Sequence, residues 1–208
     1  MGLTFLEFLV IAGALGLFIF GMKQMSDGLQ KATGEVMRRV LGSMGQNPLI
    51  GILTGFLITA LVQSSSASSV MVVSFVNAGL LSLSESIALI MGANIGTTIT
   101  AWLVSLLGFH FNVSLIALPL IAIGVPLMFT SKAGLNAWAQ ALIGFALMFF
   151  GFSEMVRAMP DIMTLEGIPL YTVSNNLDQL SLLLFISIGI VLTLIAQSSS
   201  AAMAFTLV

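Results

Sequence analysis

The chain has 208 residues, of which 58% are apolar and only 7% are charged. This small number of charged residues cannot cover the surface of a water-soluble globule of this size. The composition therefore excludes a soluble domain and indicates a protein of the lipid bilayer. The net charge of −2 provides no basic patch for nucleic acid or for an anionic membrane surface. Cysteine is absent, which excludes disulfides and thiolate metal sites.

Long apolar runs predict an all-α membrane protein, because the strands of a membrane barrel would alternate over segments of about ten residues. The candidate spans are residues 3–22, 87–107, 113–130, 135–156 and 180–196, with a further apolar block at 48–81. We expect residues 23–47 to form a cytoplasmic loop with a short interfacial helix over 34–44, because most of the basic residues lie there. The sequence therefore predicts a multi-pass protein of the cell inner (plasma) membrane.

The apolar block at 48–81 is interrupted by the polar segment Gln63-Ser64-Ser65-Ser66. Its first arm, 48–62, would form a helix of about 22 Å, which is too short for roughly 30 Å of hydrocarbon. We therefore expect a re-entrant helical hairpin over 48–80, whose polar tip is buried in protein or lines a wet cavity. The next helix, 82–107, contains two glycines and an asparagine between Gly92 and Thr98, which predict local unwinding and a broken transmembrane helix.

Two pairs of similar segments indicate an internal repeat. LFIFGMKQM at 17–25 resembles LMFFGFSEM at 147–155, and LITALVQSSSASS resembles VLTLIAQSSSAAM, with Gln63 matched to Gln197. If the hairpin does not cross the bilayer, two helices cross between the copies of the first helix, so the second copy has the opposite orientation. We therefore expect inverted repeats. The first would cover 1–134, with hairpin 48–80, broken helix 82–107 and helix 113–130, and the second would be an incomplete repeat at 135–208.

Inverted repeats with broken helices are the usual plan of secondary transporters, which bind substrate and ions near the bilayer midplane. A half-helix that ends there presents free amides at its N-terminus and free carbonyls at its C-terminus, which suit an anion and a cation respectively. In the first hairpin, the carbonyls of residues 60–62 are expected to face Na⁺ and the amides of residues 65–68 an anion. Serine hydroxyls can serve either ion.

The paired Gln-Ser-Ser-Ser motifs and the Gly92–Thr98 segment resemble the signatures of the Na⁺/phosphate cotransporter type II family. The resemblance covers essentially the whole chain and implies a sodium-coupled symporter of inorganic phosphate across the plasma membrane. It implies Na⁺ as the coupling ion, no other cofactor, and both ions bound between the two hairpin tips. The residues that it implies for binding are Gln63, Ser64, Ser65, Ser66, Asn94, Thr97, Thr98, Gln197, Ser198, Ser199 and Ser200.

Within that set, Na⁺ is assigned to Gln63, Ser64, Gln197 and Ser198. One feature departs from the family pattern, because the chain ends at Val208, shortly after the second motif. The second repeat is therefore expected to be truncated, and the protein to need either a homo-oligomer or a missing C-terminal part.

Three other interpretations stay open. Serine and threonine in membrane helices often bond to their own backbone or act as small packing residues, and Asn94 could form a structural interhelical hydrogen bond. A serine hydrolase that uses His110, the only histidine, is disfavoured because neither motif has a Gly-x-Ser-x-Gly context, so no enzyme is expected. A non-transporting membrane scaffold, or a partial subunit that requires a partner chain, is the main alternative.

Overall fold

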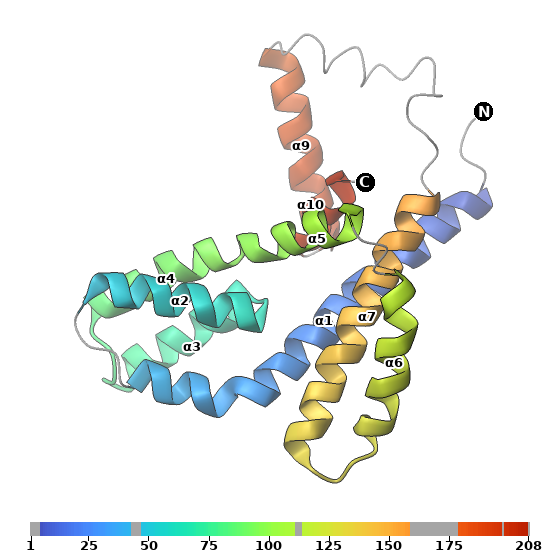
Figure 1. Ribbon diagram of the computed structural model, residues 1–208. Helices are drawn as coiled ribbons and strands as arrows, with labels where there is room; N and C mark the ends of the chain where they lie inside the picture. Colours follow the sequence, from blue (N-terminus) through green and yellow to red (C-terminus); the bar gives the residue numbers. More distant parts are fainter. Residues whose placement is uncertain (1–4, 43–46, 111–113, 159–178, 197, 208) are drawn as a thin grey trace.

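The computed structural model describes residues 5–42, 47–110, 114–158, 179–196 and 198–207, and this part of the chain is all-helical (Figure 1). The predicted all-α fold class is confirmed. Within the described residues, three helices are long and apolar enough to cross a membrane: Phe5–Met37, Leu83–Leu106 and Ala133–Ala158. Large apolar side chains are widely exposed, as at Leu115 (73%) and Ile195 (77%), which suits hydrocarbon and not water.

The first helix, α1, runs without interruption from Phe5 to Gly42. Its 38 residues span about 57 Å, which exceeds the hydrocarbon thickness of a bilayer. The prediction of a loop that begins at residue 23, with a separate helix at 34–44, is therefore wrong as far as residue 42. The helix continues because this stretch has no proline and its polar residues at 23, 26, 27 and 30 recur at helical spacing, which leaves another face free for packing.

Helix α7 (Ala133–Ala158) packs along α1 through glycines that let the two backbones meet. A methyl group on Gly21 would overlap the backbone nitrogen of Met148, and one on Gly151 would overlap the backbone nitrogen of Phe18. The later residue of one helix thus meets the earlier residue of the other, so the helices are antiparallel (Figure 1). Small residues at such contacts are the usual means of close helix packing in membranes.

Helices α2 (Pro48–Val62) and α3 (Ser65–Asn77) are separated by a two-residue break. Gln63 has a left-handed backbone (φ 56°), which ends α2 and turns the chain. The Thr59 hydroxyl donates to the Ser68 hydroxyl at 2.9 Å, although nine residues of continuous helix would separate them by about 13 Å. The chain therefore folds back at the break, and α3 returns alongside α2 (Figure 1).

Helices α4 (Leu83–Gly96) and α5 (Thr98–His110) are nearly continuous, with an interruption at Thr97. The unwinding expected over residues 92–98 is thus confined to one residue. Both glycines of this segment are used for packing, because a methyl group on Gly92 or Gly96 would overlap a carbonyl oxygen of α2. Close packing against α2 therefore explains these glycines without an unwound segment.

The remaining described helices are α6 (Ser114–Met128), α9 (Gln179–Ala196) and α10 (Ser199–Leu207). Helix α6 packs on α7 although it contains two prolines, and α10 contacts α5, α9 and α1. Among the shorter apolar helices, α2, α3 and α6 have 15, 13 and 15 residues, so none of them reaches across a bilayer unaided.

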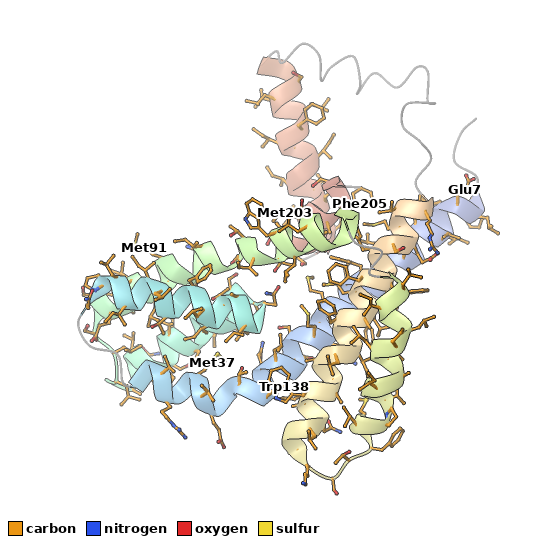
Figure 2. All side chains as sticks on the ribbon, in the orientation of Figure 1. Glu7, Met37, Met91, Trp138, Met203 and Phe205 are labelled. Carbon is orange, nitrogen blue, oxygen red and sulfur yellow. The ribbon has the colours of Figure 1, made fainter. Side chains whose placement is uncertain are left out.

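Two clusters of buried side chains hold these helices together. One joins α1, α5, α7 and α10 around Phe18, Phe149 and Phe152. The other joins the end of α1 to α2, α3 and α4 around Met37, which Figure 2 shows directed from α1 toward the α2–α3 pair. Met91 of α4 points away from the bundle, as expected for a lipid-facing residue (Figure 2). The single long helix α1 therefore takes part in both clusters.

Replacing Gly21 by alanine should destabilise the protein, because the added methyl group forces the α1 and α7 backbones apart. We expect a loss of about 1–3 kcal/mol in the free energy of unfolding, the usual effect of overpacking. The matched control is Gly16→Ala on the same helix, where nothing lies within 4 Å of the added atom. Thermal unfolding in detergent measures the stability of each variant relative to the wild-type protein. Equal midpoints for the two would contradict the packing described here.

Candidate functional site

A cavity of about 550 Å³ lies where the two Gln-Ser-Ser-Ser segments, one face of α1 and the α4–α5 junction meet. Its volume corresponds to roughly ten to twenty water molecules, enough for hydrated ions. Three apolar residues complete its wall, Ile19, Met22 and Ala196. Its polar lining consists of Lys23, Ser26, Asp27, Gln30, Gln63, Ser64, Ser65, Ser66, Thr97, Ser198, Ser199 and Ser200.

The break between α2 and α3 is held by the side chain of Gln63. Its backbone N–H donates to the Thr59 carbonyl at 2.7 Å, which closes α2. Its side-chain amide donates to the Ala60 carbonyl and accepts a hydrogen bond from the Thr100 hydroxyl of α5. Both ends of the amide are engaged, so Gln63 fixes the shape of the break and ties it to α5.

A second support for the break comes from α1. The Ser26 hydroxyl donates to the Val62 carbonyl at 2.7 Å, and this pair is buried. The carbonyls of residues 60–62 were expected to face a cation, but those of Ala60 and Val62 already accept hydrogen bonds from side chains. These two oxygens therefore each have a side-chain donor inside the protein, and each carbonyl oxygen has a second lone pair for a cation.

The second break repeats the local geometry of the first. The Ser64 hydroxyl accepts from the amide of Ala67 at 3.3 Å, and the Ser198 hydroxyl accepts from the amide of Ala201 at 3.2 Å. Each serine is thus the N-cap of the short helix that follows it, α3 or α10. Gln197, the predicted counterpart of Gln63, lies outside the described residues.

Helices α3 and α10 therefore begin at the same cavity. The backbone amides in the first turn of a helix have no intrahelical acceptor, and the aligned peptide dipoles give this end a partial positive charge. Ser65 and Ser66 open α3, Ser199 and Ser200 open α10, and all four line the cavity. Their hydroxyls add donors and acceptors, so the arrangement can bind an anion.

Of the predicted site residues, the structure brings eight to this cavity: Gln63, Ser64, Ser65, Ser66, Thr97, Ser198, Ser199 and Ser200. Asn94 and Thr98 are exposed and do not line it. The Thr98 hydroxyl donates to the Ile95 carbonyl, three residues earlier in the chain. This is the backbone hydrogen bond that the alternative interpretation of the serines and threonines predicts. The side chain of His110 lies outside the described part.

Sequence reasoning missed the contribution of α1 and of Thr100. Lys23, Ser26, Asp27 and Gln30 follow the spacing i, i+3, i+4, i+7, which places them on one face of a helix. That spacing is a usable signal of a helix, but the concentration of basic residues favours a cytoplasmic loop at the same place. Thr100 gives no comparable signal, since only the fold brings it to Gln63.

The family profile and several of the relatives that match this chain have names that refer to phosphate transport. The profile of a family described as "Na+/Pi-cotransporter" matches residues 17–157. "Sodium-dependent phosphate transport protein 2A" of Ovis aries is 40% identical over 108 residues, which cover 51% of this chain and 17% of that protein. "Uncharacterized protein YqeW" of Bacillus subtilis is 30% identical over 187 residues, 88% of this chain and 57% of that protein.

A further relative has a name that specifies phosphate. "Putative inorganic phosphate export protein YjbB" of Escherichia coli is 29% identical over 204 residues, which cover 97% of this chain and 36% of that protein. The chain therefore spans less than two thirds of the length of each of these relatives. No solved structure matches the chain.

The cavity can be tested by cysteine labelling, because the chain has no cysteine of its own. Ser66→Cys and Ser199→Cys should react with a charged, water-soluble thiol reagent, since both positions are exposed in the polar cavity. Ser68→Cys is the control, because Ser68 lies on the same helix as Ser66 and is only 3% exposed. Mass spectrometry gives the extent of labelling. Failure of both cavity positions to react would contradict a water-accessible site.

Proposed function

The chain belongs to the Na⁺/Pi-cotransporter family, and on this basis we propose that it is a sodium-coupled symporter of inorganic phosphate across the plasma membrane. Membership confirms the resemblance seen in the sequence motifs. The family is one of transporters, so the chain is not an enzyme. Movement of phosphate by this chain is the proposal, and it rests on the site described above.

The observation that carries the proposal is the convergence of two helix N-termini on one polar cavity. Phosphate is a tetrahedral oxyanion with several acceptor oxygens, and it needs donors from more than one direction. The first turns of α3 and α10 offer backbone amides and serine hydroxyls from two chain segments. We assign the anion to Ser65, Ser66, Ser199 and Ser200, which are the first two residues of these helices.

Sodium is assigned to the oxygen atoms beside the anion. Na⁺ is a hard cation that prefers oxygen ligands, and the hydroxyls of Ser64 and Ser198 lie at the two breaks. The Ser64 hydroxyl is 3.2 Å from that of Ser66, so the cation and anion positions are adjacent at the first break. Gln63, and Gln197 by analogy, would act mainly by holding the breaks in shape.

The proposed architecture is a pair of inverted repeats with re-entrant hairpins. Contacts between α1 and α7 support it, because Gly21 meets Met148 and Gly151 meets Phe18, and an offset of 130 residues exchanges one pair for the other. Such reciprocal contacts between antiparallel helices are expected from a two-fold axis in the membrane plane. The short helices α2 and α3 at the first break, and α10 after the second, suit hairpins that enter and leave on one side.

A second candidate function is that of a non-transporting scaffold or of a partial subunit that requires a partner chain. The chain spans 17% to 57% of the length of the relatives named above. The site itself favours transport, because a scaffold has no need of a polar cavity between two helix breaks. Measuring transport separates the two functions directly.

Purified protein in liposomes should take up labelled phosphate faster with an inward Na⁺ gradient than with an equal K⁺ gradient. Gln63→Ala should reduce the sodium-dependent part to background, because it removes the hydrogen bonds to Ala60 and Thr100. Ser74→Ala is the control, since among the described residues this exposed hydroxyl bonds only to the Val70 carbonyl of its own helix. Gel filtration verifies that both variants are folded.

Two outcomes would contradict this proposal. Equal phosphate uptake in the Na⁺ and K⁺ gradients would exclude sodium coupling, and it would favour the scaffold function if uptake is absent in both. Full sodium-dependent uptake by Gln63→Ala would show that the break does not form the site. Efflux from phosphate-loaded liposomes, measured in the same preparation, gives the preferred direction of flux.

A further inference from the structure

We propose that the carboxylate of Asp27 on α1 is a ligand of the coupling cation. Asp27 is the one acidic residue that lines the cavity in the described part of the chain. The inference rests on the proposed function and deepens it, since it assigns the cation a charged ligand from outside both Gln-Ser-Ser-Ser motifs. Three features of Asp27 support it: its depth in the bilayer, its surroundings and its charge.

The depth of Asp27 follows from the packing of α1 on α7. A methyl group on Gly144 would overlap the backbone nitrogen of Met25, and one on Gly28 would overlap that of Ala141. Asp27 lies between these two contacts, so it is level with residues 141–144, near the middle of the spanning helix Ala133–Ala158. Ionisable residues at such a depth are rare and mark ion or substrate pathways.

The surroundings of Asp27 differ from those of Lys31, which lies one helical turn further along α1. The Lys31 amine donates to the Gln140 side chain of α7 at 2.8 Å, so this charge is satisfied within the protein. Asp27 has no hydrogen bond or ion pair with any described residue, and Lys23, which lines the same cavity, forms none with it. A half-buried carboxylate in a low-dielectric setting gains strongly from a cation at close range.

Oxygen atoms suitable for such a cation lie next to Asp27 on α1. The Gln30 side-chain nitrogen donates to the Ser26 hydroxyl at 3.4 Å, and that hydroxyl donates to the Val62 carbonyl. Because the nitrogen of Gln30 is the donor, its amide oxygen is left as an acceptor. Asp27 and Gln30 therefore bring a carboxylate and an amide oxygen to one side of the cavity, a ligand set that fits Na⁺.

The charge of Asp27 also gives a reason for coupling. An empty Asp27 carboxylate repels an oxyanion in the same cavity, and a bound Na⁺ removes that repulsion. Phosphate binding should therefore depend on prior or simultaneous binding of Na⁺. Neutralising Asp27 should weaken Na⁺ binding and, at the same time, make phosphate binding less dependent on Na⁺. A residue with a purely structural role would not produce this pair of effects.

The test measures thermal unfolding of the purified protein as NaCl replaces KCl at constant ionic strength. We expect Na⁺ to raise the midpoint of the wild-type protein, and Asp27→Asn to increase the half-saturating Na⁺ concentration by about tenfold or more, the usual loss for one charge-assisted contact. Asp27→Glu should keep a response to Na⁺. The control is Glu35→Gln, which removes an exposed acid of α1 outside the cavity.

A second experiment measures the affinity for labelled inorganic phosphate with and without Na⁺. Asp27→Asn should reduce the difference between these two affinities. An unchanged Na⁺ response in folded Asp27→Asn overturns the inference, as does stabilisation of the wild-type protein by acid but not by Na⁺. If Asp27→Asn does not fold, Gln30→Leu must raise the half-saturating Na⁺ concentration, and an unchanged value overturns it. If Na⁺ stabilises the protein through Asp27 but the protein takes up no phosphate, the proposed function is contradicted and the inference about Asp27 stands.

Discussion

The close approach of the α1 and α7 backbones is the constraint on which the site depends. Glycines at 21 and 28 on α1 and at 144 and 151 on α7 permit it, because any side chain there would overlap the facing backbone. Two residues along a helix correspond to about 200° of rotation, so a face that packs through Gly21 directs Lys23 to the opposite side. Packing on α7 thus determines that the polar residues of α1, from Lys23 to Gln30, face the cavity. They lie level with the middle of the candidate spanning helix α7.

The two helix breaks solve one physical problem in the same way. A chain that turns inside hydrocarbon must satisfy its freed backbone groups within the protein. Serine N-caps satisfy amides at both breaks, and at the first break Ser26 of α1 and Thr100 of α5 hold the carbonyl of Val62 and the side chain of Gln63. Helix α10, which follows the second break, packs against the same two helices. A displacement of α1 relative to α5 would therefore act on both breaks together.

Local patterns in the sequence were sufficient to predict the helices, the polar breaks and most of the cavity-lining serines. Contacts between distant segments were not predictable in this way. Hydropathy falls after Phe20, yet α1 continues to Gly42 because α7 and the α2–α3 pair cover its apolar faces. A glycine at position 92 in mid-helix predicts unwinding, whereas Gly92 packs on α2. The two proposed repeats also differ, since Gly55 meets Leu89 of α4 while Gly189, at the position that the repeat predicts to be equivalent, has nothing within 4 Å.

The charges around the cavity explain why an oxyanion would be carried together with a cation. Each helix N-terminus contributes about half a positive charge, and α3 and α10 supply two of them. Lys23 and Asp27 are the charged side chains among the lining residues, and their formal charges sum to zero although they form no ion pair. Phosphate near neutral pH carries roughly two negative charges, so the filled cavity would keep an excess of about one negative charge in a low-dielectric region. Binding at least one monovalent cation removes that excess, so the proposed sodium coupling would be an electrostatic consequence of where α1 places its polar face.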